Sequence, residues 1–318
     1  MEMNASVLRR TDRALLRVYG RDPVRIVQGI ITNDIANAPA DRAVYAALLT
    51  PKGRMVADVR VVRRGADLLL DVPASALDAL LALFKRTVPP LFARFEDVTA
   101  NHAMIGVYGP DALRAVVAVL GSLPVLAGTD GFAAVEHDGG TVEVLTTNDT
   151  GSGDVDLIVP VEISSSIEDA LHAAGATHID ASTLDVLRIE AGTPRWGAEL
   201  DETTIPLEAG LQSRAISTGK GCYTGQEVII RILHRGHVNW QLRGFLLGDA
   251  PAPSAGATLT RSGETKTVAR ITSAAVSPRY AQTIALGYAR REIEPGTVLQ
   301  LADGGTATVI HLPFGEGK

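Results

Sequence analysis

Thiols, aromatic rings and long apolar runs are all scarce in this chain of 318 residues. The single cysteine, Cys222, excludes an intramolecular disulfide, and one thiolate cannot hold an iron–sulfur cluster by itself. Aromatic residues make up only 4 % of the chain, so aliphatic side chains must fill its core. The longest apolar region, residues 115–127, is broken by Gly121 and Pro124 and is too short to span a bilayer.

An excess of positive charge is missing as well. The formal net charge is −6, which argues against a nucleic-acid binder. Residues 1–20 lack the apolar core of a signal peptide. We therefore expect a cytoplasmic protein that uses neither nucleic acid nor a membrane as a partner.

The sequence does contain a clear change of pattern about three quarters of the way along. In the earlier part strands and helices alternate, with a helix start at Asp22 and Pro23 and a hairpin turn at residues 64–66. In the later part short strands follow one another between turn residues, as in a small barrel or sandwich. The pattern predicts a mixed α+β region over residues 1–241, with room for two subdomains, and a β-barrel over residues 242–318.

The only cysteine lies in a basic, glycine-rich stretch, residues 210–243, which holds five lysines and arginines against one acid. Lys220 precedes Cys222 by two positions, and a nearby ammonium group favours the reactive thiolate. Such a stretch would suit a small anion. Two plainer interpretations remain open, a solvated basic loop and an inert, buried cysteine.

Other motifs in this stretch do not complete a known site. Gly221 stands where a Walker phosphate loop needs serine or threonine. His234 and His237 could reach one metal ion, but two histidines make an incomplete site, so no metal is predicted.

The segment "KGCYTGQE" resembles the signature of YgfZ-type folate-binding proteins, which are relatives of the glycine-cleavage T-protein, an aminomethyltransferase. Further segments in the same order also resemble that family: "VYGRDPVRIVQGIITNDI", "YAALLTPKGRMVADVRV", "LRIEAGTPRWGAELDETTIPLEAGL" and "ARITSAAVSP". The resemblance covers nearly the whole chain.

This resemblance implies a folate-binding α+β body around a central cleft, followed by a small C-terminal β-barrel. It also implies tetrahydrofolate, or a one-carbon derivative of it, as the ligand. The partners it implies are iron–sulfur client or assembly proteins, with the thiol of Cys222 as a catalytic group.

The family's functional residues carry over unevenly. The T-protein has two adjacent carboxylates in the matching segment. In this chain Ala57 replaces the first carboxylate, and Asp58 retains the second. Asp58 is the expected base or pteridine contact. Asp156 stands where the T-protein has a pteridine-binding glutamate. The other folate-binding residues that the resemblance implies are Arg188, Glu190, Lys220, Tyr223, Gln226 and Arg235.

Two tryptophans that some relatives place near the folate are absent. Arg13 and Leu184 stand at those positions, and Trp196 in a neighbouring loop is the one candidate to replace them.

Three functions follow from these observations. The first is a tetrahydrofolate-binding accessory protein that supports iron–sulfur cluster assembly or repair through Cys222. The second is a folate-dependent aminomethyl or one-carbon transferase that uses Asp58. The third is an interaction module with a vestigial folate pocket. We expect the first.

Overall fold

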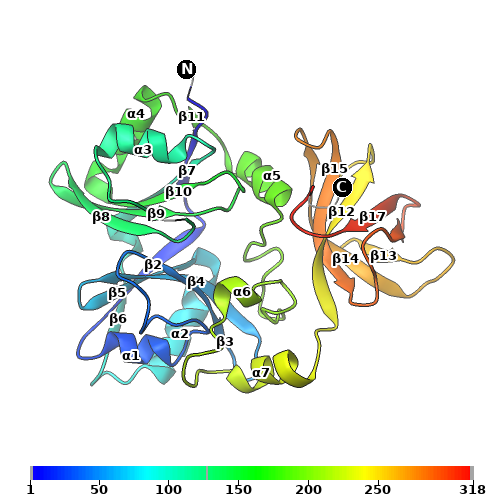
Figure 1. Ribbon diagram of the computed structural model, residues 1–318, viewed down its shortest axis with the longest axis horizontal. Helices are drawn as coiled ribbons and strands as arrows, with labels where there is room; N and C mark the ends of the chain where they lie inside the picture. The colour runs from blue at the N-terminus through cyan, green and yellow to red at the C-terminus, as the bar shows by residue number, and fades with distance from the viewer. Residues whose placement is uncertain (1–2, 127, 316–318) are drawn as a thin grey trace. The chain divides into compact units, whose positions relative to one another are not determined.

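The computed structural model describes residues 3–126 and 128–315 (Figure 1). The chain forms two compact units, which do not follow chain order. Unit 1 takes residues up to Lys52, Val56–Asp180 and Ser213–Gln226, and unit 2 takes Gly53–Met55, Ala181–Gln212 and residues from Glu227 onward. Two mixed sheets with helices precede a closed six-strand barrel, so the predicted fold class is confirmed.

Unit 1 contains a five-stranded sheet with the order β3-β4-β5-β2-β6. Asp22 caps the helix that follows β2, because its Oδ1 accepts a hydrogen bond from the Arg25 amide at 3.3 Å, as the sequence predicts. The elements of this part are β2 (Arg13–Tyr19), α1 (Pro23–Gln28), β3 (Val44–Leu49), β4 (Met55–Arg64), β5 (Asp67–Pro73), η1 (Ala74–Ala76), α2 (Leu77–Thr87), β6 (Arg94–Asp97) and η2 (Thr99–Asn101).

Unit 1 also contains a six-stranded sheet, with the order β11-β1-β7-β10-β9-β8. Helices α3 and α4 cover one of its faces (Figure 1), and their apolar side chains pack against it. The elements are β1 (Ser6–Arg10), β7 (His102–Tyr108), α3 (Ala112–Leu120), β8 (Phe132–His137), β9 (Gly140–Thr146), β10 (Val155–Pro160), η3 (Val161–Ile163), α4 (Ser164–Ala173) and β11 (Thr177–His178).

The other face of this sheet packs against the five-stranded sheet through a second apolar cluster. Alternation along each strand decides what points into this layer. On β10, Ile158 belongs to the inter-sheet cluster and Leu157 faces the helices, so Asp156 must face the inter-sheet layer as Ile158 does. On β4, Val62 belongs to the same cluster, which places Asp58, Arg60 and Arg64 on the same strand face.

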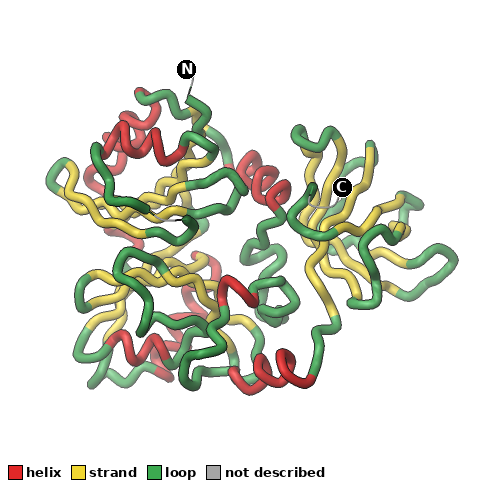
Figure 2. The backbone as a smooth tube through the Cα atoms, in the orientation of Figure 1, coloured by secondary structure: helices red, strands yellow, loops and turns green. Residues whose placement is uncertain are grey.

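Unit 2 is dominated by strands, drawn in yellow in Figure 2. They close into a barrel in the order β12-β15-β14-β13-β16-β17. Among the described residues, its apolar interior cluster holds aliphatic side chains and one aromatic ring, that of Phe245. The strands are β12 (Trp240–Gly248), β13 (Thr258–Thr260), β14 (Thr267–Ser277), β15 (Gln282–Arg290), β16 (Val298–Leu301) and β17 (Thr306–Ile310).

The remaining helices are α5 (Ala181–Ala191), α6 (Gln212–Ala215) and α7 (Gln226–Arg235).

No helix within the described ranges combines the length and the apolar character that a bilayer crossing needs.

Candidate functional site

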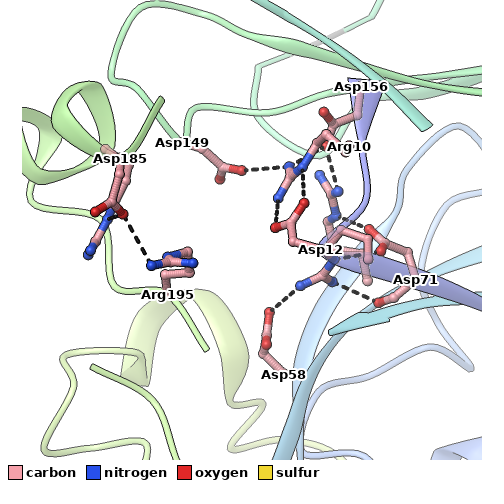
Figure 3. A network of polar contacts seen from close by, with 11 residues as sticks. Arg10, Asp12, Asp58, Asp71, Asp149, Asp156, Asp185 and Arg195 are labelled. Carbon is pink, nitrogen blue, oxygen red and sulfur yellow. Dashed lines mark hydrogen bonds and ion pairs between the residues drawn. The ribbon is translucent and has the colours of Figure 1, made fainter. Parts of the chain in front are cut away.

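A network of ion pairs, most of it buried, lies in unit 1 between the two sheets (Figure 3). Its arginines come from β1, β2 and β4, and its aspartates come from the ends or interiors of strands and from the loops beside them. We call it the ionic cluster; its members are Arg10, Arg13, Arg60, Asp12, Asp58, Asp71, Asp149 and Asp156. It holds two more carboxylates than guanidinium groups. The Asp185–Arg195 pair in the same figure belongs to unit 2.

Asp71 joins two arginines in this cluster. Its Oδ1 lies 2.7 Å from Arg13 Nε and its Oδ2 lies 2.6 Å from Arg60 Nε. Arg13 and Arg60 are also in contact with the carboxylates that the sequence singles out. Arg13 Nη1 lies 3.3 Å from Asp58 Oδ2, and Arg60 Nη2 lies 2.5 Å from Asp156 Oδ2. The cluster therefore brings Asp58 and Asp156 into one network.

Arg10 completes the network on the six-stranded sheet. Its Nη1 lies 3.3 Å from Asp156 Oδ2 and 3.6 Å from Asp149 Oδ2, and its Nη2 lies 2.8 Å from Asp12 Oδ2. Burial alone would raise the pKa of Asp149, but the Arg60 and Arg10 guanidinium groups outweigh it and hold that pKa below its usual value. The same balance, with Arg13 and Arg60 as the cations, holds the pKa of Asp71 below its usual value.

Three buried polar atoms of this region have no hydrogen-bond partner among the described residues. They are Oδ1 of Asp58, Oδ1 of Asp156 and the hydroxyl of Tyr108. Gly106 makes room for this tyrosine, because a Cβ at position 106 would lie 2.1 Å from the Tyr108 hydroxyl. Buried polar atoms are usually satisfied, so unpaired oxygens on two carboxylates indicate acceptors left for a ligand or water.

Lys220 anchors the cysteine loop, residues 217–225, to unit 1. Its Nζ donates to the carbonyl oxygens of Gln28, Ile31 and Asn33 at 2.6, 2.8 and 2.9 Å. These carbonyls lie at and beyond the end of α1, where the helix leaves acceptors without partners. Burial lowers the pKa of Lys220 to about 8, against an opposing effect of the Asp34 carboxylate.

This role for Lys220 differs from the expected one, in which the ammonium serves the thiol or the folate. Cys222 itself is exposed and unpaired, so the interpretation of a buried cysteine is wrong, and the reactivity of its thiol stays a prediction. Tyr223 is buried, its ring lies 5.2 Å from Lys220 Nζ, and its hydroxyl has no partner among the described residues. Gln226 begins α7, and Arg235 ends it in an exposed position.

Arg188 and Glu190 belong to unit 2, whereas the ionic cluster belongs to unit 1. Arg188 Nη1 lies 2.5 Å from Glu199 Oε2, and Ser277 Oγ donates to Glu190 Oε1 at 2.5 Å. These contacts hold α5 against β14. These contacts within unit 2 are enough to explain why both side chains are buried. Their contact with folate stays a prediction.

The sequence interpretation missed most of the ionic cluster. Arg60 and Asp71 each interrupt an apolar strand, and a charged residue at an inward-facing position of such a strand indicates a buried ion pair. That signal could have identified them. Arg13, noted only as the replacement of a tryptophan, is the residue that contacts Asp58. Leu184 lies on α5 in unit 2, and Trp196 pairs with Leu200 there.

Comparison with known structures first establishes the class of fold. The crystal structure of the glycine cleavage system aminomethyltransferase T from Bartonella henselae superimposes with a TM-score of 0.87, covering 98 % of this chain and 87 % of that one. Sequence identity in this comparison is 20 %, so it shows a shared fold alone.

Sequence comparison then establishes the family. Residues 6–220 match the GCVT N-terminal domain, and residues 241–315 match the glycine cleavage T-protein C-terminal barrel domain. The chain is 32 % identical to an aminomethyltransferase of Rubrobacter xylanophilus over 94 % of its own length and 80 % of the relative's. It is also 32 % identical to the "tRNA-modifying protein YgfZ" of Serratia proteamaculans, over 71 % of its length and 66 % of the relative's. The chain belongs to the glycine cleavage T-protein family.

Proposed function

We propose that this chain binds tetrahydrofolate at the ionic cluster and transfers an aminomethyl or other one-carbon unit to it. The observation that carries the proposal is the pair of unpartnered carboxylate oxygens, Asp58 Oδ1 and Asp156 Oδ1. The names of the relatives support transfer more strongly than the accessory role that the sequence favours, because most of the relatives compared are aminomethyltransferases.

The chemistry of the cluster suits a reduced pterin. The pterin's ring edge carries an amino group beside ring N–H groups, and carboxylate oxygens are strong acceptors for such donors. The surplus of carboxylates in the cluster favours a donor-rich ligand over an anion at this point. When bound, tetrahydrofolate would supply nucleophilic nitrogen atoms that take up the one-carbon unit.

The chain's own residues have distinct tasks in this proposal. Asp58 accepts a hydrogen bond through Oδ1 while Arg13 holds Oδ2 from the other side. Asp156 offers its free Oδ1 in the same way, with Arg10 and Arg60 on Oδ2. Because the arginines are themselves fixed by Asp71 and Asp12, the acceptors are oriented before the ligand arrives.

An aminomethyl-transfer assay with purified protein, tetrahydrofolate and a loaded lipoyl carrier tests the proposal. We expect turnover that Asp58→Asn lowers at least about tenfold, because one charge-assisted acceptor is lost. Asp67→Asn is the matched control, since Asp67 pairs with Arg17 outside the cluster and should leave turnover unchanged. Absence of turnover by the wild-type protein would contradict the transfer function.

A second candidate function rests on the cysteine loop. The exposed thiol of Cys222, in a loop fixed by Lys220, supports the accessory role in iron–sulfur cluster assembly or repair. Similarity to the Serratia protein named YgfZ also favours it.

A Cys222→Ser variant distinguishes the two proposed functions. If the accessory role holds, this variant keeps folate binding but does not restore iron–sulfur enzyme activity in a deletion strain. Asp58→Asn provides the reciprocal comparison, since it alters the ionic cluster and leaves the thiol in place. Full restoration by Cys222→Ser would refute a role for the thiol.

A further inference from the structure

A cavity of about 490 Å³ opens in unit 1 at the end of the inter-sheet layer opposite to the ionic cluster. Its walls come from the turn after β4, the start of β7, the hairpin β8–β9 and the end of β10. The lining residues used below are Arg63, Arg64, His102, Phe132, Ala134 and Glu143.

Arg64 is held rigidly at this cavity. Its Nη2 lies 2.6 Å from Glu143 Oε2, and its Nε contacts the other carboxylate oxygen. Glu143 is 2 % exposed, so this two-point contact fixes the guanidinium from the buried side.

His102 holds the same guanidinium from a second direction. Its Nδ1 lies 3.0 Å from the Val98 carbonyl oxygen, which can only accept, so Nδ1 carries the ring proton. Nε2 of the neutral ring is therefore an acceptor, and it lies 3.4 Å from Arg64 Nη2. The third nitrogen of Arg64, Nη1, takes part in none of these contacts.

Glu143 balances the charge of Arg64, and Nη1 of Arg64 is left for a ligand in the cavity. Arg63 also lines the cavity, but it lies on the opposite face of β4 from Arg64, and its Nη2 binds the Ile35 and Ala36 carbonyls. Phe132 and Ala134 add apolar surface beside the two arginines.

We propose that this cavity binds a small organic anion, whose carboxylate or phosphate group contacts Arg64 and whose apolar body lies against Phe132 and Ala134. An oxyanion would take the Arg64 guanidinium donors that the protein leaves unused. A volume of about 490 Å³ accommodates a molecule with a ring as well as the charged group.

The site is distinct from the ionic cluster. Arg64 lies six residues beyond Asp58 on β4, which at the rise of a strand corresponds to about 20 Å. None of the residues lining the cavity belongs to the cluster. The proposal therefore does not depend on the proposed transfer function.

Calorimetric titration of the full-length protein with benzoate and with inorganic phosphate tests the proposal. We expect saturable binding of at least one probe that Ala134→Glu weakens at least about tenfold, because it adds a negative charge at an exposed lining position. Thr306→Glu adds the same charge at an exposed site on the barrel and should leave the affinity unchanged. Stronger binding of benzoate would identify a carboxylate with a ring, and stronger binding of phosphate a phosphate ester.

A double variant, Arg64→Met with Glu143→Leu, separates binding from folding. It removes both charges together, so no unpaired charge is left buried. We expect it to remain folded by circular dichroism and to lose the probe. Equal affinity in this variant and the wild type, or no binding of either probe to the wild type, would overturn the proposal. Competition of the probe with tetrahydrofolate would also overturn it, because the two sites would then be one.

Discussion

At the scale of single residues, Asp71 is the node on which the ionic cluster depends. It is 2 % exposed and binds Arg13 and Arg60 with different oxygens. Each of these arginines in turn orients one of the proposed ligand contacts, Asp58 or Asp156. Asp71 is thus a positioning residue, and removing it should affect both stability and ligand binding.

We predict that Asp71→Ala lowers the free energy of unfolding by about 3–5 kcal/mol, since it leaves two buried guanidinium groups without their shared partner. Urea denaturation measures this loss. Asp67→Ala, which removes the partly exposed pair with Arg17, should cost about 1 kcal/mol or less. Similar losses in the two variants would show that the cluster contributes no more than a surface ion pair.

At the same scale, the sequence singled out two carboxylates but did not predict their surroundings. The family resemblance singled out Asp58 and Asp156, and the structure places both in one network. Their arginine partners come from distant parts of the chain, and strand pairing alone brings Arg60 opposite Asp71. A single sequence does not reveal such pairing.

At the scale of elements, the cysteine loop combines fixed ends with an accessible middle. Backbone hydrogen bonds join Ser217 N to the Thr32 carbonyl at 3.1 Å and Thr224 N to the Gly29 carbonyl at 3.2 Å. Between them Cys222 is exposed, and a Cβ at Gly221 would meet no atom within 4 Å. The sequence predicted a flexible basic turn, whereas Lys220 and these bonds tie the loop to α1 and the residues after it.

The glycines of this loop should therefore respond differently to substitution. Gly225 has a left-handed φ of +81°, and a Cβ there would lie 2.6 Å from the Thr50 carbonyl oxygen. We predict that Gly225→Ala lowers the free energy of unfolding by about 1–3 kcal/mol. Gly221→Ala should leave stability unchanged, because it has neither constraint.

Thermal denaturation of the two alanine variants checks this prediction. Equal stability of both would mean that the loop is not held in the conformation described. A loss of Cys222-dependent function in Gly221→Ala, without a loss of stability, would indicate that a partner approaches the bare backbone closely.

At the scale of the whole molecule, local patterns predicted the elements better than their grouping. The barrel strands and the helix at Asp22 were evident from periodicity and turn residues. Unit 2, however, recruits Ala181–Gln212 and Gly53–Met55 in addition to the barrel. These associations rest on contacts such as Arg188–Glu199–Ser273, which join residues far apart in sequence.

The distribution of ion pairs predicts that acid opens unit 1 before unit 2. Asp12, Asp71 and Asp149 all have a pKa held below the usual value by buried or half-buried arginines, despite the opposing effect of burial. A carboxyl whose pKa is lowered by folding stabilises the folded state above the unfolded pKa, and that stabilisation is lost as the pH falls through the folded pKa. In unit 2, burial raises the pKa of Glu208, while at Asp201 burial is outweighed by hydrogen bonds from Thr203 that lower the pKa, so no arginine cluster is responsible for either shift.

Hydrogen exchange with mass spectrometry between about pH 5 and pH 2 measures this order. Peptides from β2, β4 and β5 should lose protection at a higher pH than peptides from the barrel strands. Earlier loss in the barrel would show that the ionic cluster does not govern acid stability.

The most direct test of the account is calorimetric titration of the purified protein with tetrahydrofolate. The account predicts saturable binding that Asp58→Asn and Asp156→Asn each weaken at least about tenfold, because each removes a charged acceptor with an unpaired oxygen. Cys222→Ser should bind as the wild type does, since the thiol is not part of the cluster. Failure of the wild-type protein to bind millimolar tetrahydrofolate, or wild-type affinity in both asparagine variants, would contradict the account.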